Sequence, residues 1–189
     1  MKAFLLAIWE VAEVVIIAVI TVFLIRTFLV QPFLVSGASM EPNFSTSDYL
    51  LIDEITYRFR EPQRGEVVVF KYPNDPKTYY IKRIIGLPGE TVEITGGNVF
   101  VYDTGGSRVK LEELYLRPSL ETSGSLSKDL GEKEYFVMGD NRGFSFDSRS
   151  WGKLDEKYII GLVRLRLLPL TSVRLFDYVD VVENLNLIN

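Results

Sequence analysis

The first 30 residues constrain this chain more than any other stretch. Residues 4–30 are mostly apolar, and their only charged side chains are Glu10, Glu13 and Arg26. A helix needs about 20 such residues to cross a bilayer, so the segment is long enough. The glutamates lie near its entry end, and Arg26 can extend its charge to water at the exit end. Residues 1–30 are therefore expected to form one transmembrane helix that anchors the rest of the chain.

Two other interpretations of this segment stay open. Lys2 provides the short basic region of a cleaved signal peptide, but no small-x-small cleavage site closes the apolar run. The two glutamates also allow a helix that lies on a membrane surface. Lys2 and Arg26 flank the segment with one positive charge each, so the count of positive charges does not decide the topology.

The sequence pattern changes at Pro32, which ends any helix. From there to residue 170, short runs rich in Val, Ile, Phe and Tyr alternate with turn residues. This pattern predicts a mainly β domain over residues 31–170. The expected strands are residues 49–52, 66–70, 79–81, 91–94, 98–102, 134–138 and 159–163, with turns at 74–76, 87–89, 96–98 and 104–107.

The remaining segments carry weaker signals. Residues 111–116 fit a short helix or a turn, and the polar residues 122–130 fit a mobile loop. Residues 164–170 fit an edge strand, because arginines alternate with apolar residues there. Residues 171–189 are expected to form a C-terminal tail that can include a short helix.

The 189-residue chain contains no histidine and no cysteine. A Ser-His-Asp triad, a Cys-His dyad, a His- or Cys-ligated zinc site and disulfides are all excluded. We expect neither a cofactor nor a metal. The formal net charge of -4 gives no support for nucleic-acid binding, which usually requires a basic face. A serine nucleophile in this chain must use Lys, Asp, Glu or Tyr as its base.

Ser39 is the candidate nucleophile, just past the apolar segment. Gly37 and Ala38 leave room for backbone N–H groups to approach a substrate carbonyl, and Pro42 stiffens the exit of the turn. An oxyanion hole needs donors fixed in this way. Taken alone, the stretch equally fits an ordinary turn in which Ser39 bonds to its own backbone.

Lys82 is the candidate base. In an alternating strand it shares a face with Tyr80 and Ile84, which predicts that the amine is buried. Burial lowers the pKa of a lysine, as a general base near pH 7–8 requires. The common alternative is a lysine that extends from a strand edge into water.

The third segment is the loop 138–152, which places Asp, Asn, Arg and Ser side chains between glycines directly after an apolar strand. Such a loop can form a dense hydrogen-bond network. We expect its charged side chains to support the site rather than to transfer protons.

Together these segments resemble the signature boxes of bacterial type I signal peptidases, the leader peptidases. A lone Ser-Met-x-Pro pattern is weak, but three boxes in this order, with a lysine about 40 residues after the serine, are specific. The resemblance extends from residue 4 to about residue 168. It rests on Ser39-Met40-Glu41-Pro42, residues 79–89, Gly139-Asp140-Asn141-Arg142, Ser145, Asp147-Ser148-Arg149 and Trp151-Gly152, with a weaker box at residues 64–70.

The resemblance implies a role for each matching residue. Ser39 is the expected nucleophile and Lys82 the general base, with Ser145 orienting the amine. The oxyanion hole uses the Ser39 backbone N–H. A helper hydroxyl stands two positions before the nucleophile in some members, but this chain has Gly37 there, which leaves Ser36 as an unproven substitute.

Other residues are expected to support the site or line the cleft. The supporting ion pairs are Asp147 with Arg149 and Asp140 with Arg83, and the cleft residues are Met40, Tyr80 and Ile81. The chain departs from the family pattern in small ways that remove no catalytic group. Asn43-Phe44 replaces the usual Thr-Leu, Glu66 stands where Asp is usual, and Ser47 replaces a Gly.

The resemblance therefore implies a coiled antiparallel β-sheet domain that hydrolyses peptide bonds outside the cytoplasm while tethered to the cell membrane. Its expected partners are the lipid bilayer and secretory preproteins, cut after small residues at the positions one and three before the bond. A self-cleaving repressor would need an N-terminal DNA-binding domain, and residues 4–30 leave no room for one. The remaining alternative is an inactive membrane-tethered β domain that binds extended peptides.

Overall fold

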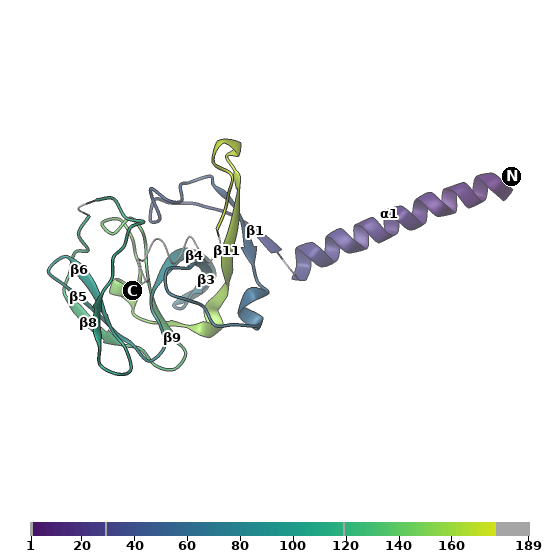
Figure 1. The fold of residues 1–189 in the computed structure, drawn as a ribbon. Coiled ribbons are helices and arrows are strands. Elements are labelled where there is room, and N and C mark those ends of the chain that lie inside the picture. The colour runs from purple at the N-terminus through teal and green to yellow at the C-terminus, as the bar shows by residue number, and fades with distance from the viewer. Residues whose placement is uncertain (1, 29, 119, 177–189) are drawn as a thin grey trace.

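The computed structural model describes residues 2–28, 30–118 and 120–176. Helix α1 (Lys2–Phe28) extends away from a body built of strands (Figure 1). Its apolar side chains between Ile8 and Val22 are mostly exposed. Within the described part of the chain, no helix combines the length and hydropathy needed to cross a membrane.

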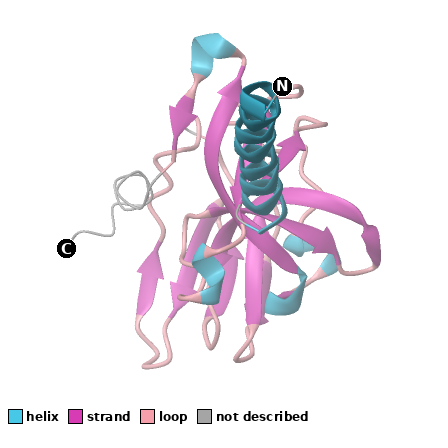
Figure 2. Ribbon diagram, turned by 90° about the vertical axis from the view of Figure 1, so that its right-hand side faces the viewer, coloured by secondary structure: helices cyan, strands magenta, loops and turns pink. Residues whose placement is uncertain are grey.

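The body contains two antiparallel sheets, which confirms the mainly β prediction (Figure 2). The large sheet has the order β1-β2-β11-β3-β4-β9-β10, with β12 paired to β11, and the small sheet has the order β7-β6-β5-β8. The large sheet consists of β1 (Val30–Leu34), β2 (Tyr49–Asp53), β3 (Val67–Tyr72), β4 (Asp75–Gly86), β9 (Glu134–Met138), β10 (Leu154–Asp155), β11 (Ile159–Leu168) and β12 (Arg174–Leu175). The small sheet consists of β5 (Thr91–Thr95), β6 (Asn98–Tyr102), β7 (Arg108–Lys110) and β8 (Leu126–Asp129). The short helices are η1 (Thr56–Arg58), α2 (Ser148–Trp151), η2 (Glu156–Tyr158) and η3 (Leu170–Ser172).

Strand β4 matters most for the site, because it is long and its second half is buried on both faces. Ile81 packs against a cluster that includes Met40 and Phe44, below the turn that carries Ser39. Ile84 packs into a second cluster on β3 and β9. Lys82 lies opposite Val68 of β3, so it enters a densely packed part of the sheet.

Three expectations about the strands are wrong. Residues 126–129 form β8, which pairs with β5, although residues 122–130 were expected to be a mobile loop. The turn expected at 74–76 involves residues 73 and 74, and β4 begins at Asp75. Residues 164–168 are not an edge strand, because this part of β11 pairs with β2 on one side and, at Leu165 and Arg166, with β12 on the other.

The segment 111–116 and the C-terminal tail are less regular than the strands. Residues 111–116 contain a turn and no helix. The C-terminal tail includes η3 and the short strand β12. The rest of the tail, residues 177–189, lies outside the described residues.

Candidate active site

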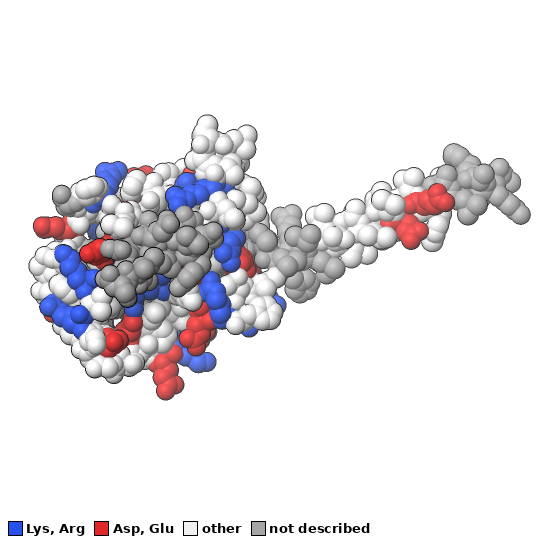
Figure 3. Space-filling model, in the orientation of Figure 1, with Lys and Arg blue, Asp and Glu red and all other residues white. Residues whose placement is uncertain are grey.

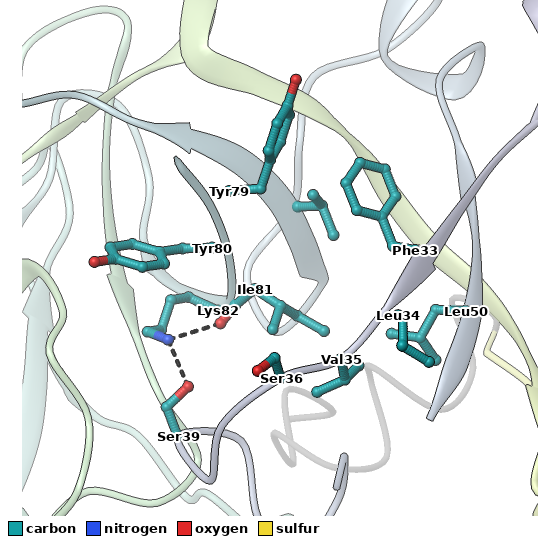
Figure 4. A pocket seen from close by; sticks show the side chains of 11 residues that line it. Phe33, Leu34, Val35, Ser36, Ser39, Leu50, Tyr79, Tyr80, Ile81 and Lys82 are labelled. Atoms are coloured by element: carbon teal, nitrogen blue, oxygen red, sulfur yellow. Dashed lines mark hydrogen bonds between the residues drawn. The ribbon is translucent and has the colours of Figure 1, made fainter. Parts of the chain in front are cut away.

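The Lys82 amine and the Ser39 hydroxyl meet beside strand β4 of the large sheet. Lys82 Nζ lies 2.7 Å from Ser39 Oγ and 2.9 Å from the carbonyl oxygen of Ile81 (Figure 4). The lysine comes from β4, and the serine comes from the turn that follows β1. The distance between Nζ and Oγ is within the range for direct proton transfer between a nucleophile and its base.

The surroundings of Lys82 favour the neutral amine. The side chain is 3% exposed, and burial lowers its pKa to about 8. Asp147 and Asp140 oppose this shift, because negative charge favours the protonated form. The Tyr80 ring lies 5.4 Å from Nζ and covers the amine on one side. A pKa near 8 leaves a useful fraction of neutral base at physiological pH.

The backbone of the nucleophile turn is held from outside by Asn141. Its N–H donates to the carbonyl of Ser39, and its side-chain amide donates to the carbonyl of Ala38, both at 3.0 Å. Among the hydrogen bonds between described residues, none uses the Ser39 N–H. That donor is therefore available to a substrate oxyanion.

Gly37 and Ser36 differ in whether they can place a second hydrogen-bond donor in the oxyanion hole. Gly37 has a φ of +101°, a conformation that side chains rarely adopt, so a helper hydroxyl at this position would be strained. Its N–H and carbonyl both bond to Thr46 Oγ1. Ser36 is exposed beside the dyad, and no hydrogen bond between the described residues joins it to Ser39 (Figure 4).

A buried ion pair lies directly behind the dyad. Arg83, next to Lys82 on β4, donates to both carboxylate oxygens of Asp140 at 2.8 and 2.7 Å. The side chain of Asn43 donates to the same carboxylate at 2.8 Å and to the Tyr115 carbonyl at 2.9 Å. The Tyr115 ring lies 4.0 Å from the Arg83 guanidinium. The pair thus connects the lysine strand, the nucleophile turn and the segment before β8.

A second pair fixes the loop between β9 and α2. Arg149 donates to both oxygens of Asp147 at 2.8 Å, and the backbone N–H of Gly139 donates to one of them at 3.0 Å. Burial alone raises the pKa of Asp147, but these hydrogen bonds outweigh it and the pKa is lowered. The carboxylate therefore stays charged and supports the loop.

The same loop, residues 139–147, is tied through Arg142 to the segment that connects β7 to β8. This fully buried guanidinium pairs with Glu113 and also donates to Thr122 Oγ1 and, at 3.2 Å, to the Tyr115 hydroxyl. The β7–β8 connection thus helps to set the position of this loop, which we call the catalytic loop.

Ser145 is the expected orienting residue whose contact is missing here. Among the described residues its buried hydroxyl makes no hydrogen bond to Lys82, and it lies near the Asp147 carboxylate, whose pKa it helps to lower. It packs against Gly139, where a Cβ atom would lie 2.3 Å from Ser145 Oγ and 2.3 Å from the Ser39 carbonyl oxygen. Gly139 is needed for this close approach, and an orienting role for Ser145 stays a prediction.

A pocket of about 130 Å³ opens next to the dyad. Its wall includes the predicted cleft residues Tyr80 and Ile81, but Met40 is not part of it. Met40 is 1% exposed and belongs to the core below the turn. Besides Ser36, Ser39 and Lys82, the pocket is lined by Phe33, Leu34, Val35, Leu50, Val69, Tyr79, Tyr80 and Ile81.

Several residues of the site and the pocket were not predicted from the sequence. Phe33 and Leu50 come from the paired strands β1 and β2, where they lie opposite each other. Alternation along residues 49–52 could have placed Leu50 on the inner face, but nothing in the sequence pairs it with Phe33. Asn43 was noticed only as a departure from the usual motif. Among the described residues, no group of three or more acidic side chains is placed to hold a metal ion.

Comparisons with known proteins identify the family of this chain. The family model described as "Signal peptidase, peptidase S26" matches residues 8–168. A probable signal peptidase I-2 of Synechocystis is 37% identical over 173 residues, which cover 88% of this chain and 76% of that protein. Signal peptidase I of Bacillus licheniformis is 34% identical over 181 residues, covering 90% of this chain and 94% of that protein.

A crystal structure of a signal peptidase I from Enterococcus faecalis is also similar, with 27% identity and a TM-score of 0.45 over 55% of this chain and 97% of that one. The sequence matches define the chain as a peptidase that hydrolyses peptide bonds through a serine. The chain belongs to the signal peptidase family, peptidase S26.

Proposed function

We propose that this chain is a membrane-anchored endopeptidase that removes signal peptides from secretory preproteins, with Ser39 as nucleophile and Lys82 as general base. One observation carries the proposal: the buried Lys82 Nζ lies 2.7 Å from Ser39 Oγ. The names of the relatives support the choice of substrate.

The first half of the reaction forms an acyl-enzyme. Neutral Lys82 accepts the proton of Ser39 Oγ while the oxygen attacks the substrate carbonyl. The oxyanion that forms accepts a hydrogen bond from the Ser39 N–H, which Asn141 helps to hold in place. Lys82 then gives the proton to the leaving amine, and the C–N bond breaks.

The second half releases the acyl group. Lys82, neutral again, accepts a proton from a water molecule that attacks the ester. The proton returns to Ser39 Oγ as the signal peptide leaves with a free carboxylate. Ser36, which is exposed and lines the pocket beside Ser39, is a candidate second oxyanion donor, whereas the first donor is the Ser39 backbone N–H.

The pocket suits small side chains on the acyl side of the bond. The pocket, of about 130 Å³, has room for the alanine-sized side chains that we propose it binds. β1 is the edge strand of the large sheet and carries Phe33, Leu34 and the start of the turn. An extended substrate can therefore add along this edge and place small residues, one and three before the cut, toward the pocket.

Helix α1 is proposed to anchor the enzyme in the membrane, with the β body on the extracytoplasmic side. Between Ile8 and Val22 its exposed surface carries no charge apart from Glu10 and Glu13, whereas the body carries charges of both signs (Figure 3). Confinement to one membrane surface raises the effective concentration of enzyme and substrate for each other.

The alternative is an inactive domain that only binds extended peptides. A binding domain has no need of a buried lysine with a pKa of about 8 next to a serine hydroxyl, because burying the amine costs stability. The dyad therefore favours the enzyme.

The decisive test uses the full chain in detergent with a preprotein that carries an Ala-x-Ala site. The wild type is expected to cut after the second alanine, and Ser39→Ala and Lys82→Ala are each expected to lose at least about 1,000-fold in kcat. Binding without cleavage by the wild type would favour the alternative, and full activity in either variant would exclude the dyad.

A further inference from the structure

Three aromatic side chains form a continuous row that begins at the dyad. The Tyr80 ring lies 5.4 Å from Lys82 Nζ, and the Tyr72 ring lies 5.0 Å from that of Tyr80. The Phe146 ring lies 5.9 Å from that of Tyr72, in an edge-on arrangement. We call Tyr80, Tyr72 and Phe146 the aromatic row. It joins β3, β4 and the catalytic loop.

The row and the pocket described above share Tyr80. In Figure 4 the Tyr80 ring lies over the Lys82 amine, and Phe33 and Leu50 lie at the opposite end of the pocket. Tyr72 and Phe146, the residues of the row beyond Tyr80, do not line the pocket. The pocket is proposed to hold residues before the cut, which leaves Tyr72 and Phe146 for residues after it.

The outer end of the row is open to solvent. Phe146 is 52% exposed, in the loop between the buried residues Arg142 and Asp147. The Tyr72 ring also lies 5.9 Å from the Trp151 ring, so the row packs against a further aromatic side chain. An exposed aromatic ring held on a rigid base suits the binding of another apolar group, because little side-chain entropy remains to be lost.

We propose that the aromatic row binds an apolar side chain of the substrate, among the first five residues after the cut. The proposal rests on the proposed function, since a peptidase must hold residues on both sides of the bond. The ring spacings place Phe146 within about 16 Å of the Lys82 amine, the reach of about five extended residues at ~3.3 Å each. The row therefore adds a preference for the start of the mature protein to the preference for small residues before the cut.

A peptide is favoured over a lipid surface because the row is continuous with the catalytic groups. Tyr80 lines the pocket and lies against the Lys82 amine, and Tyr72 and Phe146 continue the aromatic surface from Tyr80 outward. A lipid surface would cover Phe146 without any need for this continuity.

The experiment compares peptide substrates that share one Ala-x-Ala site and differ after it. Each peptide carries either Phe or Gly at one position, from the first to the fifth residue after the cut. For the wild type in detergent, kcat/KM is expected to be about tenfold higher with Phe than with Gly at one or two of these positions. Phe146→Ala is expected to remove most of this ratio, and Phe146→Leu to keep part of it. Phe59→Ala is the matched control, because Phe59 is 83% exposed and lies outside the row.

The outcomes separate the two proposals. Failure of the wild type to cut any Ala-x-Ala peptide would contradict the proposed function. Cleavage with equal rates for Phe and Gly at every position, or an unchanged ratio in Phe146→Ala, would overturn the role of the row alone. If Phe146→Ala instead lowered only the binding of the enzyme to phospholipid vesicles, the row would be a lipid contact and the inference would be wrong.

Discussion

The side-chain amide of Asn43, which follows Ser39 by four residues in the chain, lies 2.8 Å from the carboxylate of Asp140. Asp140 in turn holds Arg83, the neighbour of Lys82. Ser39 and Lys82 are 43 residues apart in sequence, and this connection fixes the turn of one against the strand of the other. Arg166 also holds the backbone of Asn43, because it donates to the Asn43 carbonyl at 2.8 Å.

Replacing Asn43 by alanine is therefore expected to lower kcat by about tenfold or more, since a shift of the nucleophile by a fraction of an ångström reduces reactive alignment. KM should stay the same, because Asn43 does not line the pocket. Steady-state kinetics at saturating substrate measure both constants. Asn98→Ala is the matched control, since its side-chain amide donates to the Gly96 carbonyl in the turn between β5 and β6, away from the site. A change confined to KM would contradict a positioning role.

Alanine substitutions at two glycines of the catalytic loop, Gly139 and Gly143, should have different effects on activity and stability. At Gly139 the new Cβ would lie 2.3 Å from the Ser39 carbonyl oxygen, so the loop and the turn must separate. At Gly143 nothing lies within 4 Å of the new Cβ. We expect Gly139→Ala to lose nearly all activity and about 2 kcal/mol of unfolding free energy, and Gly143→Ala to change both little. Urea unfolding and the cleavage assay measure these effects, and equal behaviour of the two variants would contradict the close approach.

The buried Lys82 amine should lower the free energy of unfolding, and the size of this cost depends on pH. Burial lowers its pKa from 10.5 to about 8, so between these values the unfolded chain binds more protons and the wild type gains stability as pH rises. Below pH 8 the full cost is present, at most roughly 3 kcal/mol. Lys82→Met is expected to be more stable than the wild type at pH 7 by about 1–3 kcal/mol, with a smaller difference at pH 10. Urea unfolding at both pH values tests this, and a destabilised variant at pH 7 would contradict a costly amine.

The sequence predicted the strands that carry apolar runs, and it predicted the proximity of Ser39 and Lys82 through the motif. It missed β8 because Leu126–Asp129 is polar and mostly exposed, and only its pairing with β5 makes it a strand. It also placed residues 164–168 at an edge because of two arginines. In the structure Arg164 and Arg166 lie in a central strand and reach Asp53 and Asp48.

The finer parts of the site depend on contacts between distant segments. No local pattern joins Asn43 to Asp140, 97 residues later, or Phe146 to Tyr72. Met40 was expected in the cleft because it follows the nucleophile, but the turn directs it into the core beside Phe44. Local rules predict the types of residue a site needs, whereas the direction of each side chain follows from the packing of both sheets.

The central claim is that Lys82 is the base for Ser39, and the pH dependence of kcat/KM tests it most directly. The chain has no histidine or cysteine, so Lys82, with its pKa of about 8, is the side chain expected to titrate near neutral pH. Blocking the N-terminal amine removes the other group with a similar pKa, ~7.7–8.0. We expect kcat/KM to rise about tenfold per pH unit from pH 6 and to level off above an apparent pKa near 8. A flat profile between pH 6 and pH 9 would contradict the lysine base.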